Sequence, residues 1–196
     1  MALLTPVAKA FFTDMGLDCT VLGQQVFGGH GYIREWGQEQ LVRDVRIAQI
    51  YEGTNGIQAM DLVQRKVFAN GGEWMEAYLD EIRHCVSSTQ GGELEELGAA
   101  LLDRVEQLHQ LTRILIQSGE QSALELGAAA CDYLHVVGYV SYGYMWIRML
   151  SRTVSGSVKY KTGVYFFKRI LPRIDSLIAA INSGADDLMS LSAEEF

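Results

Sequence analysis

Apolar residues recur three and four positions apart along most of the chain, and polar or glycine-rich breaks separate these stretches. This spacing is typical of helices that bury one face. No stretch alternates apolar and polar residues for long enough to predict a strand. We therefore predict an all-α fold, with helices over residues 6–27, 38–50, 55–67, 73–87, 93–117, 120–150 and 157–182.

The residues at the predicted helix ends support these limits. Thr5-Pro6 resembles an N-cap followed by proline at the first helical position. Thr54 or Asn55 can cap the third helix, after a break at Tyr51 to Thr54. Pro172 falls inside the last predicted helix and should kink it, because proline lacks the backbone N–H that the helix needs.

Asn70-Gly71-Gly72 breaks the chain, and the composition changes there. Residues 71–126 hold 3 basic and 11 acidic side chains, against 6 and 7 in residues 1–70. With 48% hydrophobic residues in a chain of 196, a buried core is expected. We predict two helical units, residues 1–70 and residues 71–196.

The formal charge of −8 argues against nucleic acid as a partner, because phosphates would be repelled. Arg148 to Arg173 nevertheless carries seven basic residues and no acidic one. This run could face the acidic helix of residues 93–117. Two interpretations stay open, a merely solvated surface and a site for an anionic ligand such as a nucleotide phosphate.

Cys19, Cys85 and Cys131 are far apart and form neither a disulfide framework nor a CxxC motif. A reducing compartment is therefore expected, and we predict a cytoplasmic protein. The most apolar stretch, Tyr133 to Ile147, contains His135 and is shorter than the roughly 20 residues of a membrane span. His135 is expected to be a hydrogen-bonded core histidine.

The glycine-rich segment of residues 28–37, GGHGYIREWG, is the first candidate for chemistry. Gly28, Gly29 and Gly31 lack a Cβ atom, so their backbone could approach a large ligand closely. The segment is not a Rossmann fingerprint, because the third glycine is missing and a helix precedes it. By themselves these glycines are more typical of a turn between helices than of a ligand-binding loop.

Glu52 is the second candidate, since it follows an apolar run and precedes Gly53-Thr54 at a helix break. If the carboxyl group lies against apolar surface, burial raises its pKa toward a value suited to proton abstraction. If it is a helix-end carboxylate in water, no such effect follows. The residues alone leave both alternatives open.

The segment of residues 24–58 resembles the C-terminal part of an acyl-CoA dehydrogenase. That family has a Q-x-x-GG-x-G-[YF] loop, then an RD pair, then I-Y-E-G-T. The chain carries these elements in the same order, as Gln25, Gly28-Gly29, Gly31-Tyr32, Arg43-Asp44 and residues 50–54. The resemblance is strong over residues 3–70.

The resemblance implies a role for each matching residue. Glu52 would be the base that takes the α-proton of an acyl-CoA thioester, while the β-hydrogen leaves as hydride to FAD and a trans-2-enoyl-CoA forms. Gly53 would border the substrate, and the backbone N–H of Glu52 would hydrogen-bond the thioester oxygen. The resemblance also implies contacts to FAD. Gln25, Val26, Phe27, Gly28 and Gly29 would contact an FAD that is held mainly by a neighbouring subunit, and Thr54, Asn55 and Gly56 would contact FAD as well.

Residues 71–196 resemble, more loosely, the appended helical domain of one subfamily, which includes long-chain-type and 3-methylmercaptopropionyl-CoA dehydrogenases. The domains that precede the C-terminal bundle in the family have no counterpart in these 196 residues. We therefore expect a fragment that neither retains FAD nor oxidises acyl-CoA by itself. An electron-transferring flavoprotein as acceptor, a homo-oligomer and a place in fatty acid β-oxidation are implied for the whole enzyme.

Two other functions remain as alternatives. Glu81-x-x-His84 and Glu106-x-x-His109 match the Glu-x-x-His pattern of di-iron carboxylate bundles, although neither pair joins an apolar stripe. Small and aromatic residues alternate over 120–150, which is expected of core packing but also of a helical module for interaction or oligomerisation. Metal ligands are not expected, and Arg43-Asp44 could orient the Glu52 segment through an ion pair.

Overall fold

The computed structural model describes residues 2–89 and 91–195, and within these ranges it contains helices and turns but no strand. The all-α prediction is therefore confirmed. The longer elements and the short α2 and α4 have the following bounds: α1 Leu4–Val26, α2 Gly29–Tyr32, α3 Gln38–Arg46, α4 Asn55–Met60, α5 Glu73–Ser87, α6 Glu93–Gln121, α7 Ala123–Leu150, α8 Val158–Tyr165 and α9 Ile174–Asn182.

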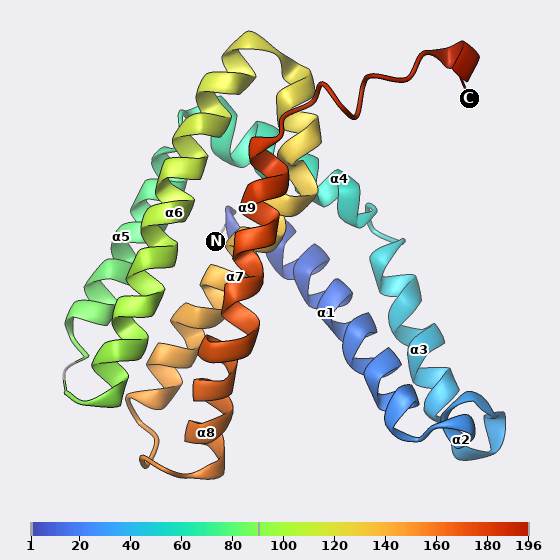
Figure 1. Cartoon of the computed structure of the whole chain (residues 1–196), viewed down its shortest axis with the longest axis vertical. Coiled ribbons are helices and arrows are strands. Elements are labelled where there is room, and N and C mark those ends of the chain that lie inside the picture. The colour runs from blue at the N-terminus through green and yellow to red at the C-terminus, as the bar shows by residue number, and fades with distance from the viewer. Residues whose placement is uncertain (1, 90, 196) are drawn as a thin grey trace.

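Helices α5, α6, α7 and α9 pack as a bundle, while α1 and α3 form an arm that leans away from it (Figure 1). Helix α7 lies at the centre, with apolar residues on every side. A helix that is apolar all round is typical of a buried position. The 15-residue apolar stretch in α7 is therefore explained by burial in the protein core.

The first turns of α1 anchor the arm to the bundle. Phe11 is fully buried, and its ring lies edge-on to Tyr139 and Tyr142 of α7, with centroids 5.0 and 4.9 Å away. A Cβ atom at Gly138 would collide with the Phe11 ring. The small residue at position 138 therefore permits the close approach of α1 and α7, as expected from the sequence.

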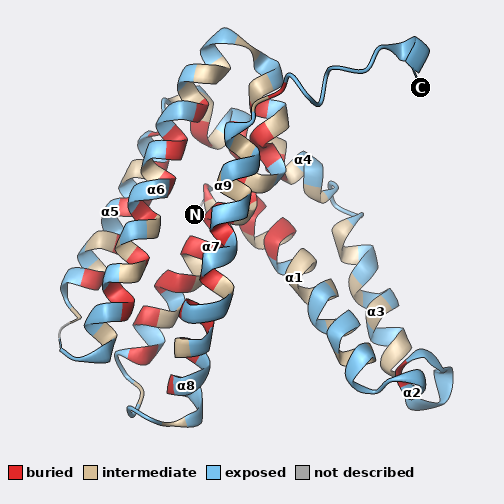
Figure 2. Ribbon diagram, in the orientation of Figure 1, coloured by how far each residue is buried: buried red, intermediate tan, exposed pale blue. Residues whose placement is uncertain are grey.

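Beyond Phe11 the arm has little cover (Figure 2). Helix α3 runs back along α1, and Gly16 and Gly23 leave room for Val45 and Gln38. The Gln38 amide also donates to the Thr20 carbonyl oxygen at 3.0 Å. The outer faces stay exposed and apolar, with large side chains at Phe12, Val21, Leu22, Val26, Phe27, Tyr32, Ile33, Trp36, Leu41, Ile47, Ile50, Tyr51 and Ile57.

Several predicted helix ends need correction. Helix α1 begins at Leu4 with Leu3 at the N-cap, so Thr5 and Pro6 lie inside its first turn. The third predicted helix changes from α to π geometry at Asp61–Val67. The last one is interrupted by a π turn at Phe166–Ile170 and a 3-10 turn at Leu171–Arg173, which contains Pro172. A disturbance at this proline is therefore confirmed.

The core is one continuous cluster that joins α1 and the Asp61–Val67 segment to α5, α6, α7 and the last helices. The division into units 1–70 and 71–196 stays a prediction, since residues from both sides of it share this core. Among the residues that the structure describes, no helix is both long enough and apolar enough to cross a lipid bilayer.

Candidate active site

Glu52 lies in the bend between the 3-10 turn Ile47–Gln49 and α4. Its φ is +55°, and within residues 2–89 and 91–195 it is the one residue other than glycine with positive φ. Gly53 follows with φ +86°. For a residue with a Cβ atom the left-handed region costs about 1–2 kcal/mol, and such strain concentrates at functional sites. The backbone therefore marks the residue that the resemblance implies as the base.

The side chain of Glu52 is exposed, so the alternative of a carboxyl group buried against apolar surface is wrong for this chain. The apolar residues that precede it, Ile47, Ile50 and Tyr51, are themselves 52%, 48% and 52% exposed. The reason is that the segment packs against α1 on one side, and no described element covers its outer side.

The carbonyl groups of Glu52 and Gly53 both accept hydrogen bonds from side chains of this chain. The Gln58 amide donates to the Glu52 carbonyl oxygen at 3.2 Å, and the Lys9 ammonium donates to the Gly53 carbonyl oxygen at 2.7 Å. In contrast, the Glu52 backbone N–H has no acceptor among the described residues. The Glu52 and Gly53 carbonyl oxygens thus accept hydrogen bonds from side chains of this chain, whereas the Glu52 N–H is left without an acceptor among the described residues.

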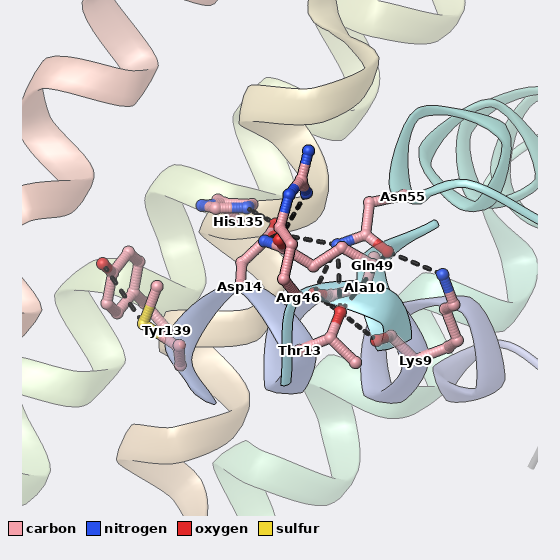
Figure 3. Close-up of polar contacts among 10 residues, drawn as sticks. Lys9, Ala10, Thr13, Asp14, Arg46, Gln49, Asn55, His135 and Tyr139 are labelled. Atoms are coloured by element: carbon pink, nitrogen blue, oxygen red, sulfur yellow. Dashed lines mark hydrogen bonds and ion pairs between the residues drawn. The ribbon is translucent and has the colours of Figure 1, made fainter. Parts of the chain in front are cut away.

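A polar network ties the bend to α1 (Figure 3). Asp14 accepts hydrogen bonds from Asn55 and Gln49, both at 2.6 Å, and lies 2.9 Å from the His135 ring nitrogen. Lys9 donates to Asn55 Oδ1 at 2.8 Å as well as to Gly53. We call Lys9, Asp14, Gln49 and Asn55 the α1 clamp.

The environment of Asp14 favours its ionised form. Partial burial opposes ionisation, but hydrogen bonds with His135, Gln49 and Asn55 and the charge of His135 outweigh it and lower the pKa of Asp14. His135 is half-buried and pairs with this carboxylate, as expected of a satisfied histidine in α7. The clamp therefore reaches from the bend through α1 to the centre of the bundle.

The sequence interpretation did not identify Lys9, Asp14 or Gln49 as part of the site. One signal was present, since Lys9, Thr13 and Asp14 place polar groups one helical turn apart on a helix with an apolar, buried start. Such polar residues need partners when partly buried. The partners of Lys9 and Asp14 lie more than 30 positions away, so local patterns could not identify them.

The resemblance assigns residues 54–56 to FAD, and in the structure these three residues make different contacts. Thr54 caps α4, its hydroxyl accepting from the Ile57 N–H at 3.5 Å, so the predicted capping is confirmed. The Asn55 side chain is engaged by α1 at Lys9, Ala10, Thr13 and Asp14. Gly56 is exposed and borders open space.

The glycine-rich segment lies at the other end of the arm. Gln25, Val26, Phe27, Gly28 and Gly29 are all exposed, and short helical turns, α2 and Arg34–Trp36, replace the expected continuous loop. Gly31 is buried, where a Cβ atom would collide with the Gln24 carbonyl. From Lys9, beside Gly53, to Gln25 the helix rises about 24 Å. The structure therefore does not bring the two predicted FAD-contacting sets together.

The remaining candidates are accounted for by local contacts. Asp44 accepts a hydrogen bond from Gln40 at 2.6 Å, and within the described ranges neither Arg43 nor Asp44 forms an ion pair. The predicted Arg43–Asp44 ion pair is thus wrong.

The Glu-x-x-His pairs serve helix packing. Glu81 accepts from the Tyr144 hydroxyl at 2.8 Å, and His84 is exposed. Glu106 and His109 join Glu76 and Arg83 in a surface network. In the described part of the chain no three His, Cys, Asp or Glu side chains are placed to hold a metal ion.

The acidic helix α6 contacts α9 through an ion pair in which α6 supplies the basic residue, Arg104, and α9 the acidic one, Asp175. The sequence predicted the opposite arrangement of charges. Two cavities are lined by residues of α1 and α7, where the arm meets the bundle, and their volumes are about 530 Å³ and about 880 Å³. Both are mainly apolar and share Phe12, Tyr142 and Trp146, and neither includes Glu52.

Comparison with known families connects these observations. The family model described as "Acyl-CoA dehydrogenase, C-terminal domain" matches residues 2–67. The model described as "Acetyl-CoA dehydrogenase C-terminal like" matches residues 78–192. The chain belongs to the acyl-CoA dehydrogenase family. The resemblance drawn from the spaced motifs, and the helical bundle with a C-terminal extension, are thereby confirmed.

Relatives of this acyl-CoA dehydrogenase chain are found in several bacteria. A 3-methylmercaptopropionyl-CoA dehydrogenase of Ruegeria pomeroyi is 43% identical over 97 residues, 50% of the chain and 16% of the relative. The broad-specificity linear acyl-CoA dehydrogenase FadE5 of Mycobacterium tuberculosis is 27% identical over an alignment that covers 99% of the chain and 35% of that enzyme. A butyryl-CoA dehydrogenase of Syntrophomonas wolfei is 39% identical over 77 residues, 39% of the chain and 13% of the relative. The chain thus spans about a third or less of the length of these relatives.

Proposed function

We propose that the chain forms the part of a flavin-dependent acyl-CoA dehydrogenase that carries the catalytic base, Glu52. The observation that carries the proposal is the strained bend at Glu52, where the acceptors are tied down and the backbone N–H remains available. The reaction would be α,β-desaturation of an acyl-CoA thioester to the trans-2-enoyl-CoA, within fatty acid β-oxidation.

The protein groups at the bend suit this reaction. The Glu52 carboxylate would accept the α-proton, and its backbone N–H would hydrogen-bond the thioester oxygen as negative charge develops there. Gly53, with no side chain, lets the thioester approach the backbone. When bound, FAD would supply the redox chemistry by accepting the β-hydrogen with its electron pair, so that the α,β double bond forms as both hydrogens leave.

The exposure of Glu52 fits this role in a larger enzyme. A carboxylate at the surface of one part of an enzyme can act as a base once a ligand and further protein surface exclude water from it. Exposed apolar residues on both sides of the bend, Tyr51 and Ile57 among them, offer surface for that cover. The desolvation that the sequence suggested would then come from the assembled site.

The residues assigned to FAD fit two separate contacts. Thr54 and Gly56 adjoin the base, whereas residues 25–29 lie at the far end of α1 and would reach the FAD of a neighbouring subunit. Glycines 28, 29 and 56 border open space, so a flat ligand can approach their backbone. The whole enzyme would be a homo-oligomer that passes electrons to an electron-transferring flavoprotein. It would be cytoplasmic, a location that suits the three free cysteines of this chain.

A chimaera tests the assignment of the base. Residues 1–196 would replace the matching segment of the mycobacterial relative, with which nearly the whole chain aligns. The Glu52→Gln chimaera should retain bound FAD and lose acyl-CoA oxidation by a factor on the order of 10³ or more, because the amide cannot take the proton. Glu39→Gln on α3 is the control. Equal oxidation rates for Glu52→Gln and its parent would refute the proposal.

A further inference from the structure

The α1 clamp forms no hydrogen bond with the Glu52 carboxylate, yet it engages the residues on both sides of Glu52. Gln49 precedes Glu52 and bonds to Asp14, while Gly53 and Asn55 follow Glu52 and bond to Lys9 and Asp14 respectively. The two ends of the bend are therefore fixed to one rigid helix. Only three residues lie between Gln49 and Gly53.

A short segment held at both ends has few conformations, and this matters because Glu52 adopts a φ that glutamate rarely occupies. Without tethers the backbone would relax to the helical or extended regions, which are accessible at lower energy. The bend also lacks cover on its outer side, so packing alone does not hold it. The contacts that can maintain the left-handed conformation are therefore hydrogen bonds, those to α1 on either side of Glu52 and the one from the Gln58 amide to the Glu52 carbonyl oxygen.

We propose that Lys9, Asp14 and Asn55 are positioning residues, which hold Glu52 in its left-handed conformation before any ligand arrives. The inference rests on the proposed function in one respect only, that the Glu52 so positioned is the base. Its conformational part, the order of the bend, is independent of catalysis.

Lys9 carries the most distinctive part of the clamp. Its ammonium group bridges the Gly53 carbonyl oxygen and Asn55 Oδ1, at 2.7 and 2.8 Å, and so joins the backbone of the bend to the first residue of α4. A charged donor forms stronger hydrogen bonds than a neutral one. Arginine could restore the charge and one of the two bonds, whereas methionine keeps the aliphatic chain and removes both.

The first test measures the bend in the 196-residue chain itself. In the parent, NMR should give Glu52 and Gly53 steady-state heteronuclear NOE values close to those of α4, with Cα and Cβ shifts of a left-handed Glu52. Lys9→Met should lower those NOE values and average the shifts toward coil, and Lys9→Arg should restore them in part. Lys161→Met, at an exposed lysine of α8, is the control. An unchanged bend in both Lys9→Met and Asn55→Ala would overturn the proposal.

The second test uses the chimaera described above. Lys9→Met should lower kcat by a factor on the order of tenfold to a hundredfold with KM changed much less, since misplacement of a reacting group by about 1 Å has effects of this size. Lys9→Arg should recover part of kcat. A loss confined to KM, or a loss that Lys9→Arg does not recover, would argue for a structural role only.

The two proposals fail in different ways. If Glu52→Gln leaves oxidation unchanged, the assignment of the base is wrong, whatever the clamp does to the order of the bend. If Glu52→Gln abolishes oxidation while Lys9→Met and Asn55→Ala leave both the NMR signals and kcat unchanged, the base stands and the positioning role is refuted.

Discussion

The Asn55 side-chain amide donates to the Asp14 carboxylate at 2.6 Å, and this bond joins the residue that opens α4 to the middle of α1. The family resemblance implies that Asn55 contacts FAD. In the structure its side chain is directed to α1, so any contact with a flavin would come from its backbone. The residue serves the site by fixing the bend that carries Glu52.

The charge of Asp14 should make stability depend on pH. Its pKa is lowered on folding from an ordinary value of 3.8, so its ionised form stabilises the folded state above that pH, and this contribution is lost as the pH falls through the lower, folded value. Asp14→Asn should reduce the free energy of unfolding at pH 7 by about 1–3 kcal/mol. The difference should shrink as the pH falls below 3.8.

Urea unfolding at several pH values, followed by circular dichroism, measures this effect. Asp18→Asn on the same helix is the control, because Asp18 is exposed. A difference between parent and Asp14→Asn that stays constant from pH 7 down to acid conditions would contradict the stabilising role of the charge.

Gly31 and Gly29 make a matched pair in the glycine-rich segment. A Cβ atom at Gly31 would collide with the Gln24 carbonyl, while one at Gly29 meets nothing within 4 Å. Gly31→Ala should therefore lower the free energy of unfolding by about 1–3 kcal/mol, as expected of overpacking, and Gly29→Ala should have little effect. Equal unfolding midpoints for the two variants would show that the turn adapts.

Gly138 and Gly127 allow the same comparison in α7. Alanine at Gly138 would press on the buried Phe11 ring and weaken the attachment of the arm, at a cost of about 1–3 kcal/mol. Alanine at the exposed Gly127 borders open space and should stabilise the helix by up to about 1 kcal/mol. Thermal unfolding of both variants tests the packing, and a stabilised Gly138→Ala would refute it.

The chain alone is expected not to retain FAD. The residues assigned to the flavin are all exposed except Asn55, and they lie at two ends of the arm, so together they cover little of a ligand that such sites normally bury by 70% or more. The purified chain should be colourless and should not quench flavin fluorescence saturably. A stoichiometric flavin absorption band would show that the chain suffices for binding.

Much of the fold could be predicted because it follows from local patterns. Helix α5 has the bounds expected for residues 73–87, and Thr54 caps α4, since periodicity and capping depend on neighbours in sequence. Helix α6 continues four residues beyond its expected end at residue 117, through Gly119 to Gln121, so a single glycine does not stop it.

The interior of the site could not be predicted in the same way. The pairs Lys9–Gly53 and Asp14–His135 join residues 44 and 121 positions apart, and no local pattern specifies such partners. The left-handed φ of Glu52 is equally hidden, because glutamate has no preference for it and tertiary contacts impose it. Motif spacing predicts the residue as the base, and the structure shows the left-handed conformation and the hydrogen bonds on either side of it.

The most direct measurement is exchange of the acyl-CoA α-hydrogen in deuterated water, because it isolates proton transfer from the redox step. In the chimaera with FAD bound, the parent should incorporate deuterium at the α-carbon, and Glu52→Gln should lose this exchange while still binding the substrate. Exchange at an undiminished rate in Glu52→Gln would contradict the assignment of Glu52 as the base.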